Sequence, residues 1–311
     1  MLTVGIDIGG TKIAGGAVDA AGAIVERLRA DTPSDAAAIA DAVVGMVQAL
    51  AERHQVARVG VAAAGFISKD RSTVIHAPNI AWRDEPLRDR LQSRLGLPVT
   101  LENDANAAGW AEYRYGAGRG HDHMVMLTLG TGVGGAIILD GELLTGGHGI
   151  AAELGHTRFV RGGRLCGCGQ HGCLEQYASG RALQRAAGEI ADAGGVGARL
   201  AALRAELGRI PGREISRLAR EGDPGAIEAV ECIATALGEG CGGLQAVVDP
   251  EVFVIGGGVS QLGEDLLAPV RRAYEASVPG LVARPLAEFT TAQLGNDAGI
   301  IGAADLAARR D

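Results

Sequence analysis

Apolar and polar positions follow two patterns along the chain, and the first pattern predicts β-hairpins. Residues 2–8 and 12–18 are short apolar runs joined by a glycine-rich turn, as expected for two paired strands. Residues 124–139 repeat this arrangement, with a second glycine-rich turn inside an otherwise apolar stretch. We therefore interpret residues 4–22 and 126–142 as an internal repeat of strand, turn and strand.

The second pattern is apolar spacing of helical period. Ser34-Asp35 supplies a cap for a helix that runs to about Arg53. Residues 99–101 predict a strand that leads through Glu102-Asn103-Asp104 into a helix over residues 105–115. Further segments are predicted as strands at 56–63 and 252–255, and as helices at 180–207, 223–247, 260–274 and 298–308. The chain is thus expected to be mixed α/β, with the last helix packed back on the N-terminal part.

Composition and charge narrow the classes of protein to consider. With 311 residues, 47% hydrophobic and 21% charged, the chain can bury a large core and divide into two lobes. The longest uncharged apolar stretch, residues 124–139, is shorter than the ~20 residues of a membrane span. Because no secretory signal precedes the first strand, we expect no membrane partner and a cytoplasmic location. A net charge of -8 without a basic run argues against nucleic acid as a partner.

Three of the five cysteines fall close together and indicate a metal site. Cys166, Cys168 and Cys173, with one imidazole, fit tetrahedral zinc, and the glycines between them allow sharp turns. A reactive or redox thiol is the weaker alternative, because C-x-x-C is absent from this run. The fourth ligand is His156 or His171, and four protein ligands would make the zinc structural. The other two cysteines lie among small apolar residues and are expected in the core: Cys232 and Cys241.

Both glycine-rich turns are candidate phosphate sites. The first, Asp7 to Lys12, offers backbone N–H groups beside a hydroxyl and one of only two lysines in the chain. The second, residues 130–135, offers the same donors without a lysine, and either turn alone could be an ordinary hairpin. Its glycines also match G-x-G-x-x-G, but a dinucleotide fold needs a helix next, and residues 136–139 predict a strand.

A third glycine run, residues 256–258, lies between a predicted strand and a predicted helix. It could let a flat base approach the backbone, or it could be a plain tight turn. The candidate nucleotide-binding residues are therefore Asp7, Gly9, Gly10, Thr11, Lys12, Gly130, Thr131, Gly132, Val133, Gly134, Gly135, Gly256, Gly257 and Gly258.

One carboxylate is placed to act as a base. Phosphoryl transfer to an alcohol needs loops and Mg²⁺ to hold charge, and one carboxylate to accept the hydroxyl proton. Asp104 follows a strand end with Asn103 beside it; the alternative is that Asp104 only caps the helix. Glu153 and Glu175 flank the cysteine loop and could hold adjacent sugar hydroxyls, although either alone would be an ordinary surface glutamate.

These motifs together resemble the ROK family of sugar kinases and repressors. The resemblance rests on four runs, Asp7–Lys12, Glu102–Ala108, Glu153–His156 and Cys166–Glu175, and it spans nearly the whole chain. Three further segments are similar to those of actinobacterial glucokinases within the family: Ala77–Ile80, Gln176–Arg181 and the turn at Gly256.

The resemblance implies the actin-like ATPase (ribonuclease H-like) fold, an α/β fold of two lobes with an active-site cleft between them. The small α/β lobe would comprise residues 1–104 plus 297–311. The large α+β lobe would comprise residues 105–296 and carry the zinc-binding loop. Members are commonly homodimers or homotetramers, so self-association is also implied.

The resemblance further implies site roles. Asp104 is the base for the sugar 6-hydroxyl, the glycine turns bind ATP with Mg²⁺, and His156 is the zinc ligand. The sugar is held by Gly65, Asn79, Asn103, Asp104, Glu153, His156 and Glu175. If His156 holds zinc through one ring nitrogen and a sugar hydroxyl through the other, the metal orients a substrate contact.

The implied activity is transfer of the γ-phosphate of ATP to the 6-hydroxyl of glucose. Kinases of N-acetylglucosamine and N-acetylmannosamine share these motifs, and polyphosphate could replace ATP, so sugar and donor stay open. A repressor of the family would carry a DNA-binding helix-turn-helix ahead of the kinase-like part, whereas the phosphate hairpin here begins at residue 4. A non-catalytic, sugar-responsive regulator is disfavoured by the complete set of Asp7, Lys12 and Asp104.

Overall fold

The computed structural model describes residues 1–77, 80, 82–280 and 284–309, which form two compact units. One unit comprises Met1–Gly120, Ala136–Ala152 and Gln293–Asp311, and the other comprises His121–Gly135 and Glu153–Ala292. The lobe boundaries implied by the resemblance stay a prediction. Among the described residues, no helix combines the length and the apolar character that crossing a membrane requires.

The first unit is built on a five-stranded sheet. Its strands are β1 (Leu2–Ile8), β2 (Lys12–Val18), β3 (Ile24–Asp31), β4 (Val56–Ala63) and β8 (Val99–Asn103). Their order is β3-β2-β1-β4-β8; β1 pairs antiparallel with β2, whereas β1, β4 and β8 run parallel. Because carboxyl ends of parallel strands share one edge, Asp7 and Asn103 come together there, opposite Ala62 and Ala63 of β4.

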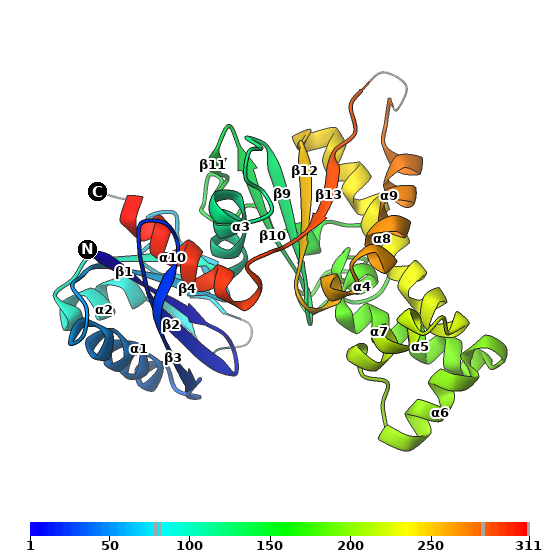
Figure 1. Ribbon diagram of the computed structural model, residues 1–311, viewed down its shortest axis with the longest axis horizontal. Helices are drawn as coiled ribbons and strands as arrows, with labels where there is room; N and C mark the ends of the chain where they lie inside the picture. The colour runs from blue at the N-terminus through cyan, green and yellow to red at the C-terminus, as the bar shows by residue number, and fades with distance from the viewer. Residues whose placement is uncertain (78–79, 81, 281–283, 310–311) are drawn as a thin grey trace. The chain divides into compact units, whose positions relative to one another are not determined.

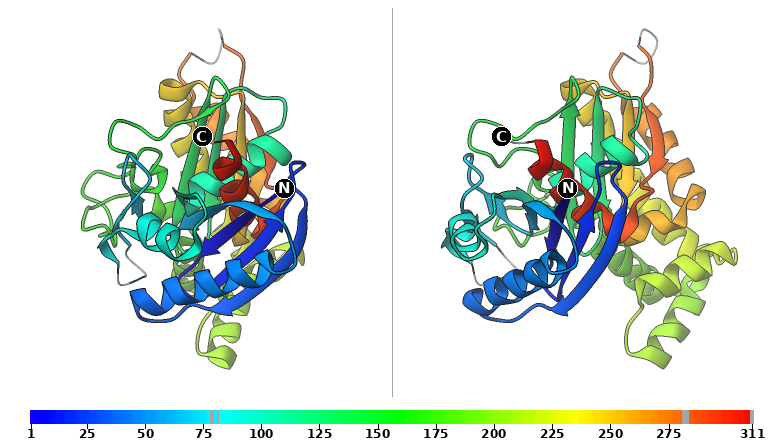
Figure 2. Two further views of the ribbon diagram at one scale, coloured as in Figure 1. Left: turned by 90° about the vertical axis from the view of Figure 1, so that its left-hand side faces the viewer. Right: turned by 60° about the vertical axis from the view of Figure 1, so that its left-hand side comes forward.

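Helices cover both faces of this sheet. One face packs against α1 (Ala36–Ala51) and α2 (Leu87–Leu95), and the other against α3 (Asp104–Tyr115) and α10 (Ala298–Arg309) (Figure 1). Figure 2 shows α1 in blue lying along the blue strands of the sheet. The predicted packing of the last helix on the N-terminal part is confirmed.

Two glycines explain how closely α10 approaches the sheet. A Cβ added at Gly5 of β1 would lie 1.9 Å from the carbonyl oxygen of Ile300, and one at Gly60 of β4 would lie 1.8 Å from that of Ala303. Any side chain at either position would push the helix away from the strands that carry Asp7 and Asn103. The apolar core on the opposite face is formed by Val4, Ile6 and Ile8 of β1 with residues of α1 and α2.

A second five-stranded sheet repeats the order of the first. It consists of β9 (Met124–Leu129), β10 (Val133–Leu139), β11 (Glu142–Leu143), β12 (Val252–Gly256) and β13 (Glu288–Thr291). The order is β11-β10-β9-β12-β13, with β12 parallel to both β9 and β13. Strand by strand this matches β3-β2-β1-β4-β8, so the predicted internal repeat is confirmed. Since β10 begins at Val133 and not at residue 135, the second glycine turn is shorter than predicted.

The helical half of the chain departs from the predictions at glycines. Its helices are α4 (Glu175–Ala178), α5 (Gly180–Ala193), α6 (Ala198–Leu207), α7 (Gly212–Arg220), α8 (Pro224–Val248) and α9 (Glu264–Ser277). The helical pattern predicted over residues 180–207 is confirmed except at residues 194–197, where Gly194 and Gly195 adopt φ of 72° and 58° and separate α5 from α6. The helix predicted from residue 260 starts only at Glu264, after a 3₁₀ turn (η3, Gly258–Leu262) and Gly263 with φ of 60°.

The structure also contains elements that were not predicted. They are β5 (Phe66–Ile67), β6 (Val74–His76) and β7 (Arg83–Glu85), which form a small antiparallel sheet in the first unit, the helices α2 and α7, and the strands β3, β11 and β13. Four of these strands, β5, β6, β7 and β11, have only two or three residues and carry too little periodicity to be recognised. The expectation for the two isolated cysteines is half right, because Cys241 is buried in α8 and Cys232 is exposed.

Candidate active site and zinc site

The first glycine turn joins β1 and β2 and exposes its polar groups. The N–H of Gly9 donates to the carbonyl of Lys12 at 3.0 Å, which closes the turn. Thr32 supports it from the end of β3: its Oγ1 donates to the carbonyl of Gly9 at 2.7 Å and its N–H to that of Thr11 at 3.1 Å. Gly10, Thr11 and Lys12 are exposed, so their donors are open to a ligand.

Asp7 and Asp104 are buried carboxyls of the first unit whose pKa values are both raised. Burial and, to a smaller extent, the negative charge of Asp104 together raise the pKa of Asp7 to about 6, against the opposing effect of Lys12. Burial also raises the pKa of Asp104, against hydrogen bonds from the backbone and from Asn103 that favour its ionised form. A carboxyl with a raised pKa is suited to accept a proton near neutral pH.

The start of α3 shows that Asp104 is not the helix cap. The cap is Asn103, whose Oδ1 accepts from the N–H of Asn106 at 3.0 Å. The amide of Asn103 also donates to the carbonyl of Gly65 at 3.1 Å, which brings that predicted sugar residue to the same place. Asp104 is the first residue of the helix, and its Oδ1 accepts from the N–H of Ala105 at 2.9 Å. Its carboxylate is therefore oriented by the backbone without being needed to hold the helix end.

The second glycine turn is held by α5 and by a carboxylate. The N–H of Gly130 donates to the carbonyl of Gly132 at 3.0 Å, and the N–H of Gly180 at the start of α5 donates to that of Gly130 at 2.9 Å. The N–H of Val133 donates to Oε2 of Glu175 at 3.1 Å. Thr131 is exposed, whereas Gly134 and Gly135 belong to β10.

The third glycine run ends β12, as predicted, and opens the 3₁₀ turn η3. Gly257 adopts φ of 82°, and an added Cβ would lie 2.5 Å from the carbonyl oxygen of Leu129 in β9. Gly258 has open space where its Cβ would lie, and Gly256 is buried at the strand end. The run therefore lets the backbone pass close to β9 and leaves room at Gly258.

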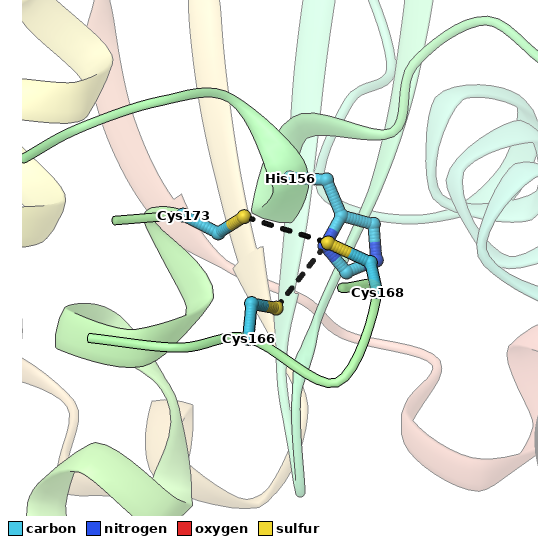
Figure 3. A group of neighbouring side chains, drawn as sticks. All are labelled: His156, Cys166, Cys168 and Cys173. Atoms are coloured by element: carbon cyan, nitrogen blue, oxygen red, sulfur yellow. Dashed lines mark hydrogen bonds between the residues drawn. The ribbon is translucent and has the colours of Figure 1, made fainter. Parts of the chain in front are cut away.

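Four ligand atoms converge in the second unit. The side chains of His156, Cys166, Cys168 and Cys173 bring one nitrogen and three sulfurs within 4.8 Å of one another (Figure 3). Sγ of Cys166 lies 3.7 Å from Nδ1 of His156, and Sγ of Cys168 lies 3.6 Å from Sγ of Cys173. Around a tetrahedral zinc with Zn–S about 2.3 Å and Zn–N about 2.0 Å, such atoms are about 3.6–3.8 Å apart.

The electrostatics of the cluster also favour a cation. Burial and, to a smaller extent, the neighbouring thiols of Cys168 and Cys166 together raise the pKa of Cys173 to about 12. A divalent cation would reverse this repulsion, since a coordinating thiol is held deprotonated. The cluster fits a structural zinc site with all four positions filled by protein.

The backbone of the cysteine loop explains which histidine takes part. The loop folds back on itself through bridges between Leu165 and His171 and between Arg158 and Cys173. His171 is exposed, with its Nδ1 3.1 Å from the carbonyl oxygen of Gly163, so it lies outside the cluster. His156 reaches the cluster from a 3₁₀ turn (η1, Leu154–His156).

The two predicted sugar carboxylates adjoin this loop in different ways. Glu153 immediately precedes η1 and follows Ala152, whose φ of 66° is unusual for a residue with a Cβ. Glu175 opens α4, and its carboxylate lies between the zinc site and the second glycine turn: Oε1 is 3.6 Å from Sγ of Cys166, and Oε2 accepts from Val133. Asn79 lies outside the described residues.

The structure thus gathers the predicted residues into two sets, one in each unit. The first unit contains Asp7, Gly9, Gly10, Thr11, Lys12, Gly65, Asn103 and Asp104. The second unit contains the second glycine turn, the glycine run 256–258, Glu153, Glu175 and the zinc ligands. Sequence reasoning missed Thr32 and the role of Glu102, which accepts from the N–H of Asn103 at 3.0 Å. Glu102 stood within a recognised run, whereas Thr32 carried no signal of its own.

Comparisons with known proteins converge on one family. A profile of the ROK family matches residues 3–310. A glucokinase of Streptomyces coelicolor is 47% identical over 312 residues, which covers 100% of this chain and 98% of that protein. An N-acetylmannosamine kinase of Yersinia pseudotuberculosis is 35% identical over 301 residues and 96% of each chain.

A solved structure agrees with these relatives. The crystal structure of a ROK family glucokinase from Streptomyces griseus, in complex with glucose and AMPPNP, matches with a TM-score of 0.88 and 48% identity over 100% of both chains. The match confirms the fold implied by the sequence resemblance, the actin-like ATPase fold, which the two sheets of equal strand order express within this chain.

Proposed function

This chain belongs to the ROK family, and we propose that it transfers the γ-phosphate of ATP to the 6-hydroxyl of glucose, the reaction of a glucokinase. The observation that carries the proposal is the 47% identity to a glucokinase over the full chain. The N-acetylmannosamine kinase is 35% identical, so the comparison favours glucose over an N-acetylated hexosamine. The comparison of kcat/KM among sugars, described below, decides between glucose and an N-acetylated hexosamine.

Asp104 is the proposed base. Its carboxylate accepts the proton of the 6-hydroxyl while that oxygen forms a bond to the γ-phosphorus, and the bond from this phosphorus to the bridging oxygen of ADP breaks. Burial raises its pKa, which strengthens the carboxylate as a proton acceptor. The bond from the N–H of Ala105 to Oδ1 fixes the orientation of the carboxylate.

Two groups of residues bind the substrates in this proposal. Glucose is held by Gly65, Asn79, Asn103, Glu153, His156 and Glu175. ATP is held by the backbone N–H groups of the two glycine turns, with Lys12 and Asp7 beside the first and residues 256–258 near the base. Mg²⁺ arrives with ATP and neutralises charge on the phosphates.

The cluster of His156, Cys166, Cys168 and Cys173 holds the structural zinc. When bound, the metal neutralises the thiolates and fixes the loop from which Glu175 follows. Figure 3 shows the His156 ring beside the thiols, with Nδ1 3.7 Å from Sγ of Cys166. Nδ1 would therefore hold the metal, and Nε2 would be left to donate a hydrogen bond to the sugar or accept one from it.

The wider organisation is also part of the proposal. It comprises a small lobe of residues 1–104 plus 297–311 and a large lobe of residues 105–296, in a cytoplasmic enzyme. Self-association as a homodimer or homotetramer is expected, and light scattering coupled to size-exclusion chromatography measures it. A monomer at micromolar concentration would contradict that expectation.

The test of the base is Asp104→Asn in an ATP-coupled assay with glucose. We expect kcat to fall by about 10³-fold or more, because a general base and its orientation are lost together. Asparagine keeps the acceptor for Ala105, so the fold should persist, and circular dichroism checks this. The control is Asp89→Asn, a surface residue of α2 paired with Arg88, which should leave kcat unchanged. A kcat for Asp104→Asn within tenfold of the parent would remove Asp104 as the base.

The sugar is tested by kcat/KM for glucose, mannose, N-acetylglucosamine and N-acetylmannosamine. Glucose should exceed the N-acetylated sugars by about 10²-fold, since an unaccommodated acetamido group leaves polar groups unpaired. A higher kcat/KM for an N-acetylated sugar would replace glucose as substrate and leave the kinase assignment intact. Replacing ATP by polyphosphate in the same assay identifies the donor.

A further inference from the structure

A buried ion pair lies directly before the proposed base in the first unit. Nη1 of Arg71 is 2.9 Å from Oε1 of Glu102, and the two side chains are only 7% and 1% exposed. Removing two charges from water costs more than their attraction returns unless other hydrogen bonds complete the site, so such a pair is weak evidence of a stabilising role. The pair requires another explanation.

The backbone of Arg71 is unfavourable as well. Its φ of 58° lies in the left-handed region, which an arginine rarely adopts. The surrounding turn maintains this conformation: the N–H of Arg71 donates to the carbonyl of Ser68 at 2.9 Å, and Oδ1 of Asp70 accepts from the hydroxyls of Ser68 and Ser72 at 2.6 and 2.8 Å. A strained residue that its surroundings hold in place is typical of functional sites.

Glu102 transmits the position of the arginine to the start of α3. The oxygen that meets Arg71 also accepts from the N–H of Asn103 at 3.0 Å and from Nδ2 of Asn106 at 3.1 Å. Asn106 in turn donates its backbone N–H to the capping oxygen of Asn103. One carboxylate oxygen therefore holds the residue before Asp104 and the residue two positions after it.

Arg71 also reaches a third segment of the same unit. Its Nη1 lies 3.4 Å from the carbonyl oxygen of Gly149, and this contact is buried. Gly149 packs on the backbone of the turn, since an added Cβ would lie 2.8 Å from N and Cα of Lys69. In sequence, Gly149 lies four residues before Glu153, so the arginine also fixes the start of the chain leading to that predicted sugar ligand.

We infer that Arg71 and Glu102 form a positioning pair for phosphoryl transfer: the buried pair holds the Asn103–Asn106 segment, and with it Asp104, in the geometry that the reaction requires. The inference rests on the proposed function of Asp104. The two residues touch no substrate in this assignment and act through Asn103 and Asn106. Their contribution should therefore appear in kcat and not in the affinity for ATP.

The experiment compares Arg71→Met, Glu102→Gln and the double variant in the full chain. Each single variant removes one charge of this buried ion pair and should lower the melting temperature. The double variant removes both charges and keeps an amide oxygen at position 102, so its melting temperature should return to within about 3 °C of the parent. Its kcat should stay about 30-fold below the parent with KM for ATP unchanged, because misplacement by less than 1 Å is enough for such a loss.

A control and a second measurement make the result decisive. The exposed pair of Arg94 and Asp41, 2.7 Å apart, is replaced as Arg94→Met with Asp41→Asn, and neither kcat nor melting temperature should change. Hydrogen exchange at the Asn103 and Asn106 amides should be about tenfold faster in the Arg71→Met, Glu102→Gln double variant than in the parent. This readout does not depend on the sugar or on catalysis.

The outcomes separate this inference from the proposed function. A parent protein that phosphorylates no sugar contradicts the proposed function, and amide exchange then decides the positioning role alone. An active parent whose double variant regains kcat to within threefold along with its melting temperature would show that the pair is only structural. Unchanged exchange at both amides would overturn the inference in either case.

Discussion

The carboxylates of Asp7 and Asp104 and the thiols of the zinc cluster are two places where this chain gathers groups of like charge. At the carboxylates, the fold supplies Lys12, backbone N–H groups and a raised pKa, and the groups remain able to exchange a proton. At the thiols, the pKa of Cys173 rises to about 12, and no cation of the chain is among the causes of its shift. The first centre is completed by a substrate that comes and goes, the second by a metal that stays.

The difference predicts how each centre responds to the loss of its partner. When a carboxylate that works by proton exchange is replaced, the protein should lose activity but keep its fold. A centre that closes around a metal should lose structure with the metal, and activity as a consequence. The predictions below test this contrast, from the largest expected effect to the smallest.

Removing the zinc should have the largest effect. We expect Cys173→Ser, or a strong chelator, to lower the free energy of unfolding by about 4 kcal/mol, a fraction of what zinc supplies to peptides that fold only around it. His156→Ala should raise KM for glucose at least tenfold and KM for ATP less than twofold, since in the proposed function the metal orients this histidine for the sugar. His171→Ala, outside the cluster, is the control and should keep its zinc. An unchanged KM for glucose in His156→Ala would return the zinc to a purely structural role.

Two glycines of the cysteine loop separate loop geometry from ligand chemistry. A Cβ at Gly172, where φ is 77°, would lie 1.7 Å from the carbonyl oxygen of Val160, whereas one at Gly167 would meet open space. Gly172→Ala should therefore lower zinc content and stability, and Gly167→Ala should leave both unchanged. Zinc content measured by atomic absorption and the unfolding midpoint in urea distinguish the two. Equal behaviour of both variants would contradict the loop geometry.

The sequence predicts those features of the two centres whose interacting residues lie close together along the chain. The zinc ligands lie within eighteen residues, and their spacing alone indicated the metal. The hairpin of β1 and β2 was predicted to the residue, because alternation and a glycine turn are local signals. The raised pKa of Asp7 depends on burial and on Asp104, almost a hundred residues away, and no local pattern records it.

The pair of Arg71 and Glu102 shows the same limit more sharply. Glu102 stood inside a recognised run, but its partner lies in a short turn between β5 and β6, two strands that carry no usable periodicity. Likewise, the glycines at 194 and 195 are a possible signal of the break between α5 and α6. Because isolated glycines are tolerated in helices, this signal did not suffice to predict the break. Such features are fixed by tertiary packing, and only the folded chain displays them.

The dependence of folding stability on pH should have opposite signs at Asp7 and Asp305. Because the folded-state pKa of Asp7, about 6, lies above its ordinary value of 3.8, its contribution to stability is present at low pH and is lost as pH rises through about 6. Asp7→Asn should thus raise the free energy of unfolding at pH 7 by about 2 kcal/mol and abolish much of kcat. In the parent, kcat/KM should fall as pH drops below about 6, where Asp7 is protonated.

Asp305 provides the control of opposite sign. Burial would raise its pKa, but hydrogen bonds from Tyr115, Arg309 and Trp110 outweigh burial and lower it. Its contribution to stability is present above its ordinary pKa and is lost as pH falls further. Asp305→Asn should therefore lower the free energy of unfolding at pH 7 by about 1 kcal/mol. Urea unfolding at pH 5 and pH 7 measures both variants, and equal signs would refute the pKa assignments.

The smallest expected effect tests whether the zinc site and the second glycine turn of the second unit communicate. Glu175 lies between these two features, 3.6 Å from Cys166 and bonded to the N–H of Val133 at the second glycine turn. A Cβ at Gly132 would lie 2.1 Å from Oε2 of Glu175, whereas a Cβ at Gly130 would meet nothing within 4 Å. The carboxylate can swing away, so Gly132→Ala should cost at most about 1 kcal/mol of stability, the net worth of one hydrogen bond.

The effect of Gly132→Ala on ATP binding is more informative than its effect on stability. Released from Val133, the turn should bind ATP less well, with KM about fivefold higher in Gly132→Ala, because the loop loses preorganisation. In Gly130→Ala stability should match the parent, so any change in KM for ATP there reports contact with the nucleotide and not displacement of Glu175. Zinc content is the discriminating measurement. If Gly132→Ala keeps its zinc, Glu175 transmits structure from the metal loop to the turn only. If zinc is lost, the turn also stabilises the metal site.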